Sequence, residues 1–198
     1  AGTHGKTTTT SMCTHIFMAA EADPTVMIGG TLPLLHSGYR VGQGDTIILE
    51  SCEYCNSFLS FYPTVAVVLN VEADHLDFFK DLDDIKASFR KFAELVPSGG
   101  RVIANADNAG ARDVARGLNA FTFGLEPGAE CTAVNLREDK GRPVFDIHVH
   151  GEFYSHAERR VYGRHNVSNA LAAASAAYVL GLPGAAVAIQ LLRGGRVL

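Results

Sequence analysis

The sequence predicts an α/β fold: a doubly wound, mostly parallel sheet that starts from a Gly-rich phosphate-binding loop and carries a small antiparallel hairpin or meander. Two patterns support this prediction. A segment rich in Gly and Thr opens the chain and runs directly into a helical stretch, and short apolar runs then alternate with helices. Continuous apolar runs predict strands buried on both faces, as in a parallel sheet. Their alternation with helices is typical of doubly wound sheets.

The predicted strands are short runs of β-branched or aromatic residues bounded by Gly, Pro, Asn or Asp. They lie at residues 26–28, 46–49, 65–69, 102–104 and 120–123. Helices are predicted over Thr7–Ala20, Asp81–Val96, Asn108–Leu118, His165–Leu180 and Pro183–Leu192. Apolar side chains recur there at three- and four-residue spacing, most clearly in the second helix, and Gly181 ends the fourth. Between Cys131 and Val161, apolar residues fall among polar ones, which predicts the antiparallel hairpin or meander.

The length and composition suit one globular domain, or one domain with a small appendage. With 198 residues, 47% of them hydrophobic, the chain can bury a sizeable core. A formal net charge of −4 gives no positive electrostatic potential that would attract the phosphates of a nucleic acid. No apolar run is long enough to span a bilayer. We therefore expect neither a nucleic-acid nor a membrane partner. The four cysteines are too few and too scattered for a secreted disulfide scaffold.

A glycine-rich turn leads into the first helix. It reads Gly2-Thr3-His4-Gly5-Lys6-Thr7-Thr8. Such a turn points backbone N–H groups at one spot beside the positive end of the helix dipole, where a phosphate binds. Lys6 would reach the outer phosphates, and the Thr7 hydroxyl would ligate Mg²⁺. The alternative is a chance Gly-Lys-Thr in a loop, but the run of threonines and the helix directly downstream favour phosphate binding.

Candidate metal ligands follow two of the predicted strands. Glu50 ends the strand at 46–49, and Asp74 and His75 come shortly after the strand at 65–69. Mg²⁺ prefers hard oxygen ligands, and the carboxyl ends of parallel strands meet at one edge of a sheet. We therefore predict that Glu50 binds the metal and that Asp74-His75 makes a second metal or substrate contact. The alternative for Glu50 is a solvated strand end.

Cys52 and Cys55 form a Cys-x-x-Cys directly after Glu50. A zinc site needs four ligands, and the sequence holds no second pair. A redox motif would need its own βαβ setting. We interpret both cysteines as packed or pocket-lining thiols.

Three blocks of the sequence together resemble the Mur ligases, the ATP-dependent enzymes that add amino acids to the peptidoglycan precursor. The blocks are Gly2-Thr3-His4-Gly5-Lys6-Thr7-Thr8-Thr9, Asn70-Val71-Glu72-Ala73-Asp74-His75-Leu76-Asp77 and Gly163-Arg164-His165-Asn166-Val167-Ser168-Asn169-Ala170-Leu171-Ala172-Ala173. They span nearly the whole chain. The resemblance implies that residues 1–198 are the central ATP-binding domain, a fragment without the N-terminal UDP-binding and C-terminal amino-acid-binding domains. It also implies a cytoplasmic protein of bacteria.

The resemblance also implies roles for individual residues. Lys6 would contact the β and γ phosphates of ATP, and Thr7 with Glu50 would bind a first Mg²⁺. His75 matches a residue that helps to hold a second Mg²⁺, so that Lys6, Glu50 and His75 form the implied catalytic set. The remaining residues implied in nucleotide binding are Gly2, Thr3, His4, Gly5, Thr8, His165, Asn166 and Asn169, of which His165 and Asn169 match positions that contact adenine.

Three features qualify these roles. An N-terminal helix cap would also explain His165-Asn166. Cys52 and Cys55 stand where the family has aspartates, so no role is carried over to them. Other members place a carbamylated lysine about where Phe89 falls, and none is assigned here.

Within the family, His4 and the Asp77-Phe78-Phe79 segment resemble the members that join L-alanine to UDP-N-acetylmuramate through an acyl phosphate. The implied small-molecule partners are those two substrates, and the implied cofactors are ATP and Mg²⁺. We expect the fragment alone to bind nucleotide weakly, without turnover. The main alternative is the murein-peptide-recycling ligase, which joins a tripeptide to UDP-N-acetylmuramate. A small-molecule kinase has no reason to carry the second and third blocks, and a nucleotide-binding module without turnover has no need of Glu50 and His75. His4 and the Asp77-Phe78-Phe79 segment argue against a folylpolyglutamate synthetase.

Overall fold

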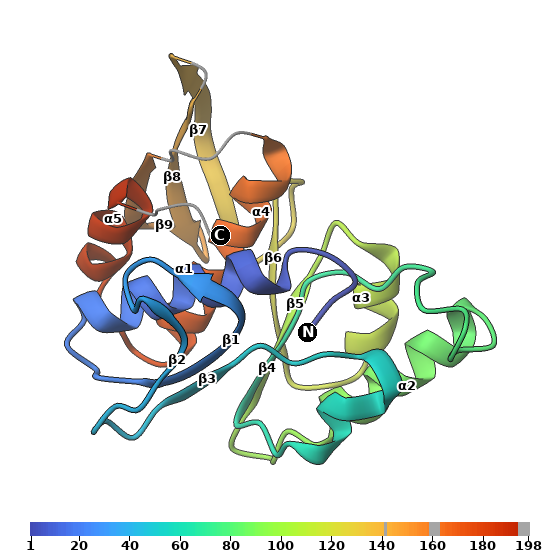
Figure 1. Ribbon diagram of the computed structural model, residues 1–198. Helices are drawn as coiled ribbons and strands as arrows, with labels where there is room; N and C mark the ends of the chain where they lie inside the picture. Colours follow the sequence, from blue (N-terminus) through green and yellow to red (C-terminus); the bar gives the residue numbers. More distant parts are fainter. Residues whose placement is uncertain (141, 159–162, 194–198) are drawn as a thin grey trace.

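The computed structural model describes residues 1–140, 142–158 and 163–193, which form two sheets and the helices that cover them (Figure 1). The larger sheet has the strand order β4-β5-β6-β7-β8-β9, and the smaller has the order β2-β1-β3. The strands are β1 Thr25–Leu32, β2 Ser37–Arg40, β3 Ile47–Leu49, β4 Val65–Val68, β5 Arg101–Asn105, β6 Ala120–Gly124, β7 Cys131–Asp139, β8 Arg142–Val149 and β9 Glu152–Glu158. The helices are α1 Lys6–Ala19, α2 Leu82–Glu94, α3 Ala109–Ala115, α4 Arg164–Val179, α5 Gly184–Arg193 and the 3-10 helix η1 Tyr54–Ser60.

The larger sheet confirms the predicted parallel arrangement with its antiparallel meander. Strands β4 to β7 run parallel to one another, whereas β8 pairs antiparallel with both β7 and β9. His150 and Gly151 make the tight turn between β8 and β9 at φ of 51° and 84°. The meander is predicted to reach Val161; β9 ends at Glu158, and residues 159–162 lie outside the described part of the chain.

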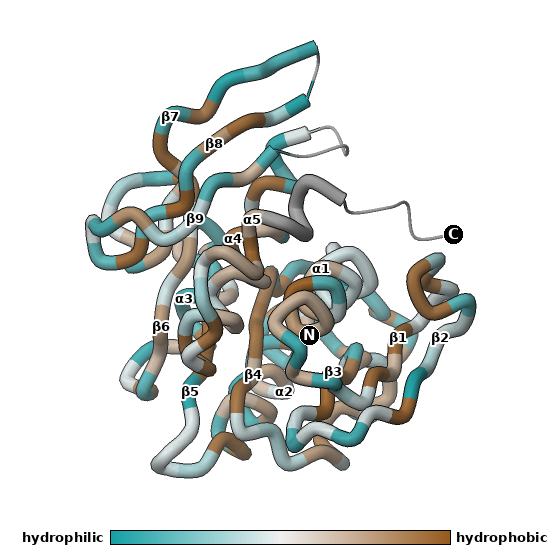
Figure 2. Tube along the Cα trace, turned by 90° about the vertical axis from the view of Figure 1, so that its left-hand side faces the viewer, coloured by the Kyte–Doolittle hydropathy of each residue, from teal (hydrophilic) through white to brown (hydrophobic). Residues whose placement is uncertain are grey.

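Both faces of the central strands are covered, which makes the sheet doubly wound. In β5, Val102 lies in a core cluster with residues of α2 and α3, whereas Ile103 lies in the opposite cluster with residues of α1 and α4. Hydrophobic residues follow β4 through the middle of the molecule, while the far end of the β7–β8 hairpin is hydrophilic (Figure 2). Successive side chains of β5 point to opposite faces, and both faces are buried. The sequence of this strand is therefore a continuous apolar run rather than an alternation of apolar and polar residues.

The smaller sheet departs from the prediction. β1 pairs in parallel with β3 as expected, but its other neighbour is β2, an antiparallel strand that the sequence analysis does not predict. The expectation that each apolar run is buried on both faces is wrong here, because the Met27 and Ile47 side chains are 62% and 65% exposed. The physical reason is that α1 packs against this sheet while the opposite side chains stay at the surface.

Most helices begin and end close to the predicted residues. Asp81 and Asn108 cap α2 and α3 by accepting hydrogen bonds from the backbone N–H groups of Asp84 and Ala111, both at 3.0 Å or less. Gly181, at a φ of 76°, follows the end of α4 as predicted. Among the described residues, no helix combines the length and the apolar character that a membrane crossing requires.

The 3-10 helix η1 is a further element that the sequence analysis does not predict. It contains Cys55 and Asn56 at φ of 53° and 56°, which is a kinked backbone rather than a regular helix. Phe58 anchors it, since its buried ring packs against Phe89 and Phe92 of α2 with centroids 5.2 and 4.7 Å away. This packing holds the segment between Glu50 and β4 in place.

Candidate functional site

The loop before α1 is tied to the end of β4. Gly5 is the N-cap residue of α1 with a φ of 83°, a left-handed conformation that favours glycine. Asn70 holds the loop through its side chain, which accepts from the His4 N–H at 2.7 Å and donates to the His4 carbonyl at 3.0 Å. The Asn70 carbonyl accepts from the Thr3 N–H at 3.2 Å. These bonds orient the loop and the first turn of α1. Thr8, in that first turn, is half-buried.

Thr7 and Glu50 meet at the carboxyl end of β3. The Thr7 hydroxyl donates to Glu50 Oε1 at 2.7 Å, and the Gly29 N–H donates to Glu50 Oε2 at the same distance. Glu50 is half-buried rather than fully solvated. The structure therefore brings together the two residues that the sequence analysis assigns to a first Mg²⁺, and both offer hard oxygen atoms.

Lys6 contacts a carboxylate that the sequence analysis does not single out. Its Nζ donates to the Gly2 carbonyl at 2.7 Å and to Glu53 Oε1 at 3.0 Å. Glu53 precedes η1 and is 2% exposed. A signal was present in the sequence, because Glu53 lies three residues after Glu50 in the same loop. Its burial depends on the kink of η1, which apolar periodicity does not reveal.

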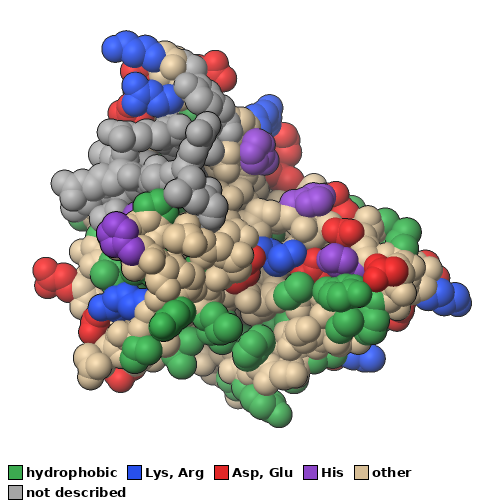
Figure 3. Space-filling model, in the orientation of Figure 1, with side chains coloured by type: hydrophobic (Ala, Val, Ile, Leu, Met, Phe, Trp, Pro, Cys, Tyr) green, Lys and Arg blue, Asp and Glu red, His purple; other side chains and the backbone are tan. Residues whose placement is uncertain are grey.

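His75 lies on the other side of Glu53. His75 Nε2 is 3.6 Å from Glu53 Oε1 and 3.9 Å from Asp74 Oδ2. The Tyr54 ring packs against the imidazole with centroids 4.8 Å apart. One ligand atom each from Glu53, Asp74 and His75 lies within 4.8 Å of the others. Figure 3 shows acidic and histidine side chains gathered beside a basic one on this face.

The predicted adenine-contacting residues lie at the start of α4. Asn169 is buried beside Gly5, whereas His165 is exposed. The Asn166 amide nitrogen is 3.0 Å from His165 Nε2. The alternative that Asn166 caps α4 is wrong, because Gly163 is the N-cap residue and Asn166 lies inside the first turn. His4 is also exposed, and its Nε2 is 3.9 Å from Glu72 Oε2.

The cysteines do not behave as the sequence analysis expects. Cys52 and Cys55 are free and exposed, so their interpretation as packed thiols is wrong, and neither lines the pocket beneath α1 that is described below. The kinked backbone of η1 turns this segment outward while burying Glu53 and Phe58. Cys13 and Cys131 are the buried thiols, and burial raises the pKa of each to about 12.

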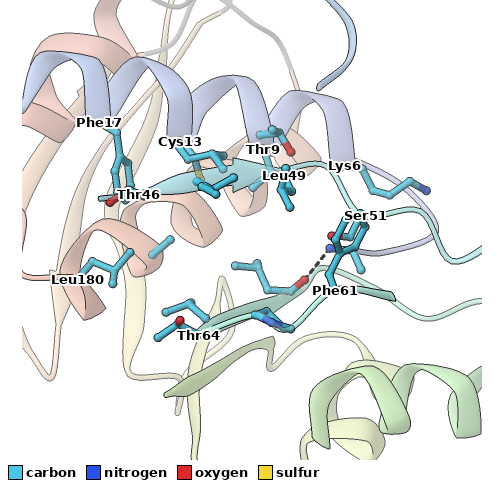
Figure 4. Close-up of a pocket in the computed structure, with 18 of the residues that line it drawn as sticks. Lys6, Thr9, Cys13, Phe17, Thr46, Leu49, Ser51, Phe61, Thr64 and Leu180 are labelled. Atoms are coloured by element: carbon cyan, nitrogen blue, oxygen red, sulfur yellow. Dashed lines mark hydrogen bonds between the residues drawn. The ribbon is translucent and has the colours of Figure 1, made fainter. Parts of the chain in front are cut away.

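A pocket of about 520 Å³ lies beneath α1, between β3 and β4 (Figure 4). Cys13 and Phe17 point toward it from α1, and Leu49 and Leu180 line it from β3 and the end of α4. Lys6 is the one predicted site residue among the described residues that line it. The pocket is therefore distinct from the polar cluster around Glu53.

The fold and the site define a class: an α/β domain whose Gly-rich loop, two carboxylates and a histidine converge at the carboxyl edge of parallel strands. The Mur ligase middle domain family matches residues 1–177, and the chain belongs to that family. The resemblance stated from the three sequence blocks is thus confirmed.

Curated relatives and solved structures agree with this membership. The chain is 45% identical over 185 residues to the UDP-N-acetylmuramate–L-alanine ligases of Clostridium novyi and Caldanaerobacter subterraneus, covering 92% of this chain and 40% of each relative. The structure of the UDP-N-acetylmuramate:L-alanyl-gamma-D-glutamyl-meso-diaminopimelate ligase from Neisseria meningitides aligns with a TM-score of 0.87 at 28% identity, covering 100% of this chain and 65% of that one. The structure of the UDP-N-acetylmuramate–alanine ligase from Thermotoga maritima aligns with a TM-score of 0.85 at 27% identity. This alignment covers 99% of this chain and 44% of that one. This chain thus spans about two fifths of the length of the curated relatives it matches.

Proposed function

We propose that this chain is the ATP-binding middle domain of an enzyme that joins L-alanine to UDP-N-acetylmuramate. One observation carries the proposal: residues far apart in the sequence meet around the Gly-rich loop, with Thr7 bonded to Glu50 and Lys6 bonded to Glu53. Phosphoryl transfer asks a protein mainly for positioning and for neutralisation of charge, and this arrangement suits both tasks.

The donor set fits the Mg²⁺ that the family implies. A threonine hydroxyl and a carboxylate, 2.7 Å apart at Thr7 and Glu50, are hard oxygen ligands. The buried Glu53 Oε2 has no hydrogen-bond partner among the described residues, so the site contains acceptor capacity that the protein itself does not use. Bound Mg²⁺ would neutralise charge on the phosphate oxygens. Thr7 and Glu50 would hold one ion, and His75 would contribute to a second.

The chain's own groups would do the remaining work. The backbone N–H groups at the start of α1 would bind phosphate oxygens, because they point out of the helix at its positive end. Lys6 would leave Glu53 and the Gly2 carbonyl to contact the β and γ phosphates. Asn70 would keep the loop oriented, and Asn169 with His165 would lie toward the adenine.

In the proposed reaction, the γ-phosphoryl group of ATP passes to the lactyl carboxylate of UDP-N-acetylmuramate, and ADP leaves. The amine of L-alanine then attacks the acyl phosphate, loses a proton and expels phosphate to leave an amide. We place this reaction in the bacterial cytoplasm. UDP-N-acetylmuramate and L-alanine are the proposed small-molecule partners, and the domains that bind them lie in the longer protein.

The tripeptide-joining ligase is the second candidate. The solved tripeptide-joining and L-alanine ligases are equally similar to this chain, at 28% and 27% identity, whereas the curated relatives at 45% identity are L-alanine ligases. That difference favours L-alanine as the acceptor. A nucleotide-binding module without turnover is less well supported, because Glu50 and His75 are both retained beside the loop.

Phosphate release by the full-length protein tests the proposal. With UDP-N-acetylmuramate, ATP and Mg²⁺, we expect release that depends on added L-alanine. Release with L-Ala-γ-D-Glu-diaminopimelate instead would transfer the assignment to the recycling ligase, and no release with either acceptor would refute both. Lys6→Ala should abolish turnover, whereas Lys91→Ala, an exposed lysine on α2, should leave it unchanged.

A further inference from the structure

We infer that Tyr54 is a positioning residue for the proposed reaction: its ring and its hydroxyl hold the His75 imidazole in the orientation in which it faces Glu53. The inference rests on the proposed function, in which His75 contributes to catalysis, and it deepens that function. The sequence analysis assigns no role to Tyr54, which lies between the two exposed cysteines of the loop after β3.

The backbone of His75 is held in an unusual conformation. Its φ is 51°, a left-handed value that is uncommon for residues other than glycine. The His75 N–H donates to Asp74 Oδ1 at 2.8 Å. The His75 carbonyl accepts from the N–H groups of Phe78 and Phe79, both at 2.9 Å. These bonds fix the point from which the side chain starts, but they leave its two torsion angles free.

Tyr54 restricts those torsion angles from the neighbouring loop. Its ring packs against the imidazole with centroids 4.8 Å apart and an interplanar angle of 44°. The same ring meets Phe78 edge-on at a centroid distance of 6.0 Å. In this position of the imidazole, His75 Nε2 is 3.6 Å from Glu53 Oε1. Without the Tyr54 ring, the imidazole would be free to rotate away from the carboxylate.

The Tyr54 hydroxyl ties the two loops together. It donates to Asp77 Oδ2 at 3.1 Å, and Asp77 lies two residues after His75 in the same loop. Tyr54 itself directly follows Glu53 and begins η1. One side chain therefore couples the loop that carries Glu53 to the loop that carries His75.

The loss of Tyr54 should lower the rate of the reaction rather than nucleotide binding. Tyr54 contacts His75, Phe78 and Asp77, whereas the nucleotide would contact the phosphate loop and the start of α4. A group that acts in the transition state must be correctly oriented there, so its misplacement costs rate. Tyr54 is 40% exposed, so its truncation should cost the fold little compared with that of a buried ring.

Steady-state phosphate release by the full-length protein separates the two effects. UDP-N-acetylmuramate, ATP, Mg²⁺ and L-alanine are supplied, and kcat and the KM for ATP are measured. We expect Tyr54→Ala to lower kcat about ten- to a hundredfold, as is typical when a residue that orients another is removed, and to leave the KM for ATP unchanged. Tyr54→Phe keeps the ring and loses the hydroxyl, so its kcat should lie between those of Tyr54→Ala and the unmodified protein.

Tyr62→Ala is the matched control, because the Tyr62 side chain is 86% exposed; it should leave both constants unchanged. A KM for ATP that rises in Tyr54→Ala while kcat stays the same would overturn the inference. Should Tyr54→Ala fail to fold, Tyr54→Leu replaces it, because leucine fills part of the same space and offers neither an aromatic ring nor a hydroxyl.

The NMR signal of the His75 imidazole tests the positioning without any turnover. It is recorded on the metal-free, full-length protein with isotope-labelled histidine, and the signal that disappears in His75→Gln is that of His75. The ring current of Tyr54, 4.8 Å away, shifts this signal. We expect Tyr54→Ala to move it toward the position of a free histidine, and Tyr54→Phe and Tyr62→Ala to leave most of the shift. An unmoved signal in Tyr54→Ala would overturn the inference.

The two measurements distinguish a failure of the inference from a failure of the proposed function. An unmodified protein that releases no phosphate with L-alanine refutes the proposed function, whatever the NMR signal shows. An active protein whose kcat is the same in Tyr54→Ala refutes the positioning role of Tyr54 and leaves the proposed function intact.

Discussion

Asn169 of α4 lies directly against Gly5, the residue that begins α1: a Cβ placed on Gly5 would lie 2.5 Å from Asn169 Oδ1. Gly5 also has a φ of 83°. Two independent constraints, backbone conformation and close approach, therefore require glycine at this position. The contact joins the predicted phosphate loop to the predicted adenine-contacting helix, which lies at the other end of the chain.

Gly5→Ala should damage both stability and nucleotide binding. A side chain at this φ is strained, which costs about 1–3 kcal/mol of unfolding free energy, and the new methyl group must displace Asn169. Urea unfolding and binding of an ATP analogue measure the two effects. Gly99→Ala is the matched control, because a Cβ there meets no atom within 4 Å. Equal behaviour of the two variants would contradict this reading of the loop.

Phe89→Ala should loosen the segment that carries Glu53. Phe89 is fully buried and packs against Phe58 of η1, so the truncation leaves a cavity between α2 and that segment. We expect a loss of about 3–5 kcal/mol of unfolding free energy, typical of buried Phe→Ala changes. Tyr62→Ala, at a side chain that is 86% exposed, should change stability by about 0.5 kcal/mol or less. Chemical denaturation measures both, and a cost for Phe89→Ala as small as that of Tyr62→Ala would mean that η1 is not anchored by this ring.

Thiol labelling should separate the cysteines into two pairs. Cys52 and Cys55 are exposed, whereas Cys13 and Cys131 are buried with pKa values raised to about 12, so their reactive thiolate is scarce at pH 8. We expect an aromatic disulfide reagent to titrate two of the four thiols of residues 1–198 in the native protein and all four after unfolding. Replacing Cys52 and Cys55 by Ser should remove the native reaction. Native labelling that persists in this double variant would contradict the burial of the other two thiols.

The ion pair between α2 and α3 should make stability depend on pH below about 4. Lys86 Nζ donates to Asp113 Oδ2 at 2.9 Å, and this bond lowers the pKa of Asp113 below its ordinary value of 3.8. A carboxyl whose pKa is lower in the folded state stabilises the fold above the ordinary pKa, and this contribution is lost as the pH falls through the folded value. Asp113→Asn should therefore be less stable than the unmodified protein at pH 7, by an amount that is smaller at pH 3.

Urea unfolding at the two pH values measures this difference. Asp45→Asn serves as the control, since the Asp45 carboxylate is exposed and takes part in none of the ion pairs found among the described residues. A gap between Asp113→Asn and the unmodified protein that is the same at both pH values would show that the Asp113 charge does not contribute.

The regular elements of the central sheet were predictable because local sequence and tertiary environment agree there. Residues 65–69 and 102–104 are continuous apolar runs, and both faces of the corresponding strands are in fact covered by helices. The β1–β2 hairpin was not predictable in the same way. Ser37–Arg40 lacks an apolar run, and its strand conformation arises from pairing with β1 at the surface.

The sequence by itself determined the helices α1 to α5, the central parallel strands, the Gly-rich loop and the positions of Glu50 and His75, because these depend on local patterns and on residue type. The tertiary structure decided which side chains meet. It buried Glu53 next to Lys6, 47 positions apart in the chain, and turned Cys52 and Cys55 outward. The physical reason is that burial in an irregular segment depends on long-range packing, here of Phe58 against α2, and no local periodicity encodes that packing.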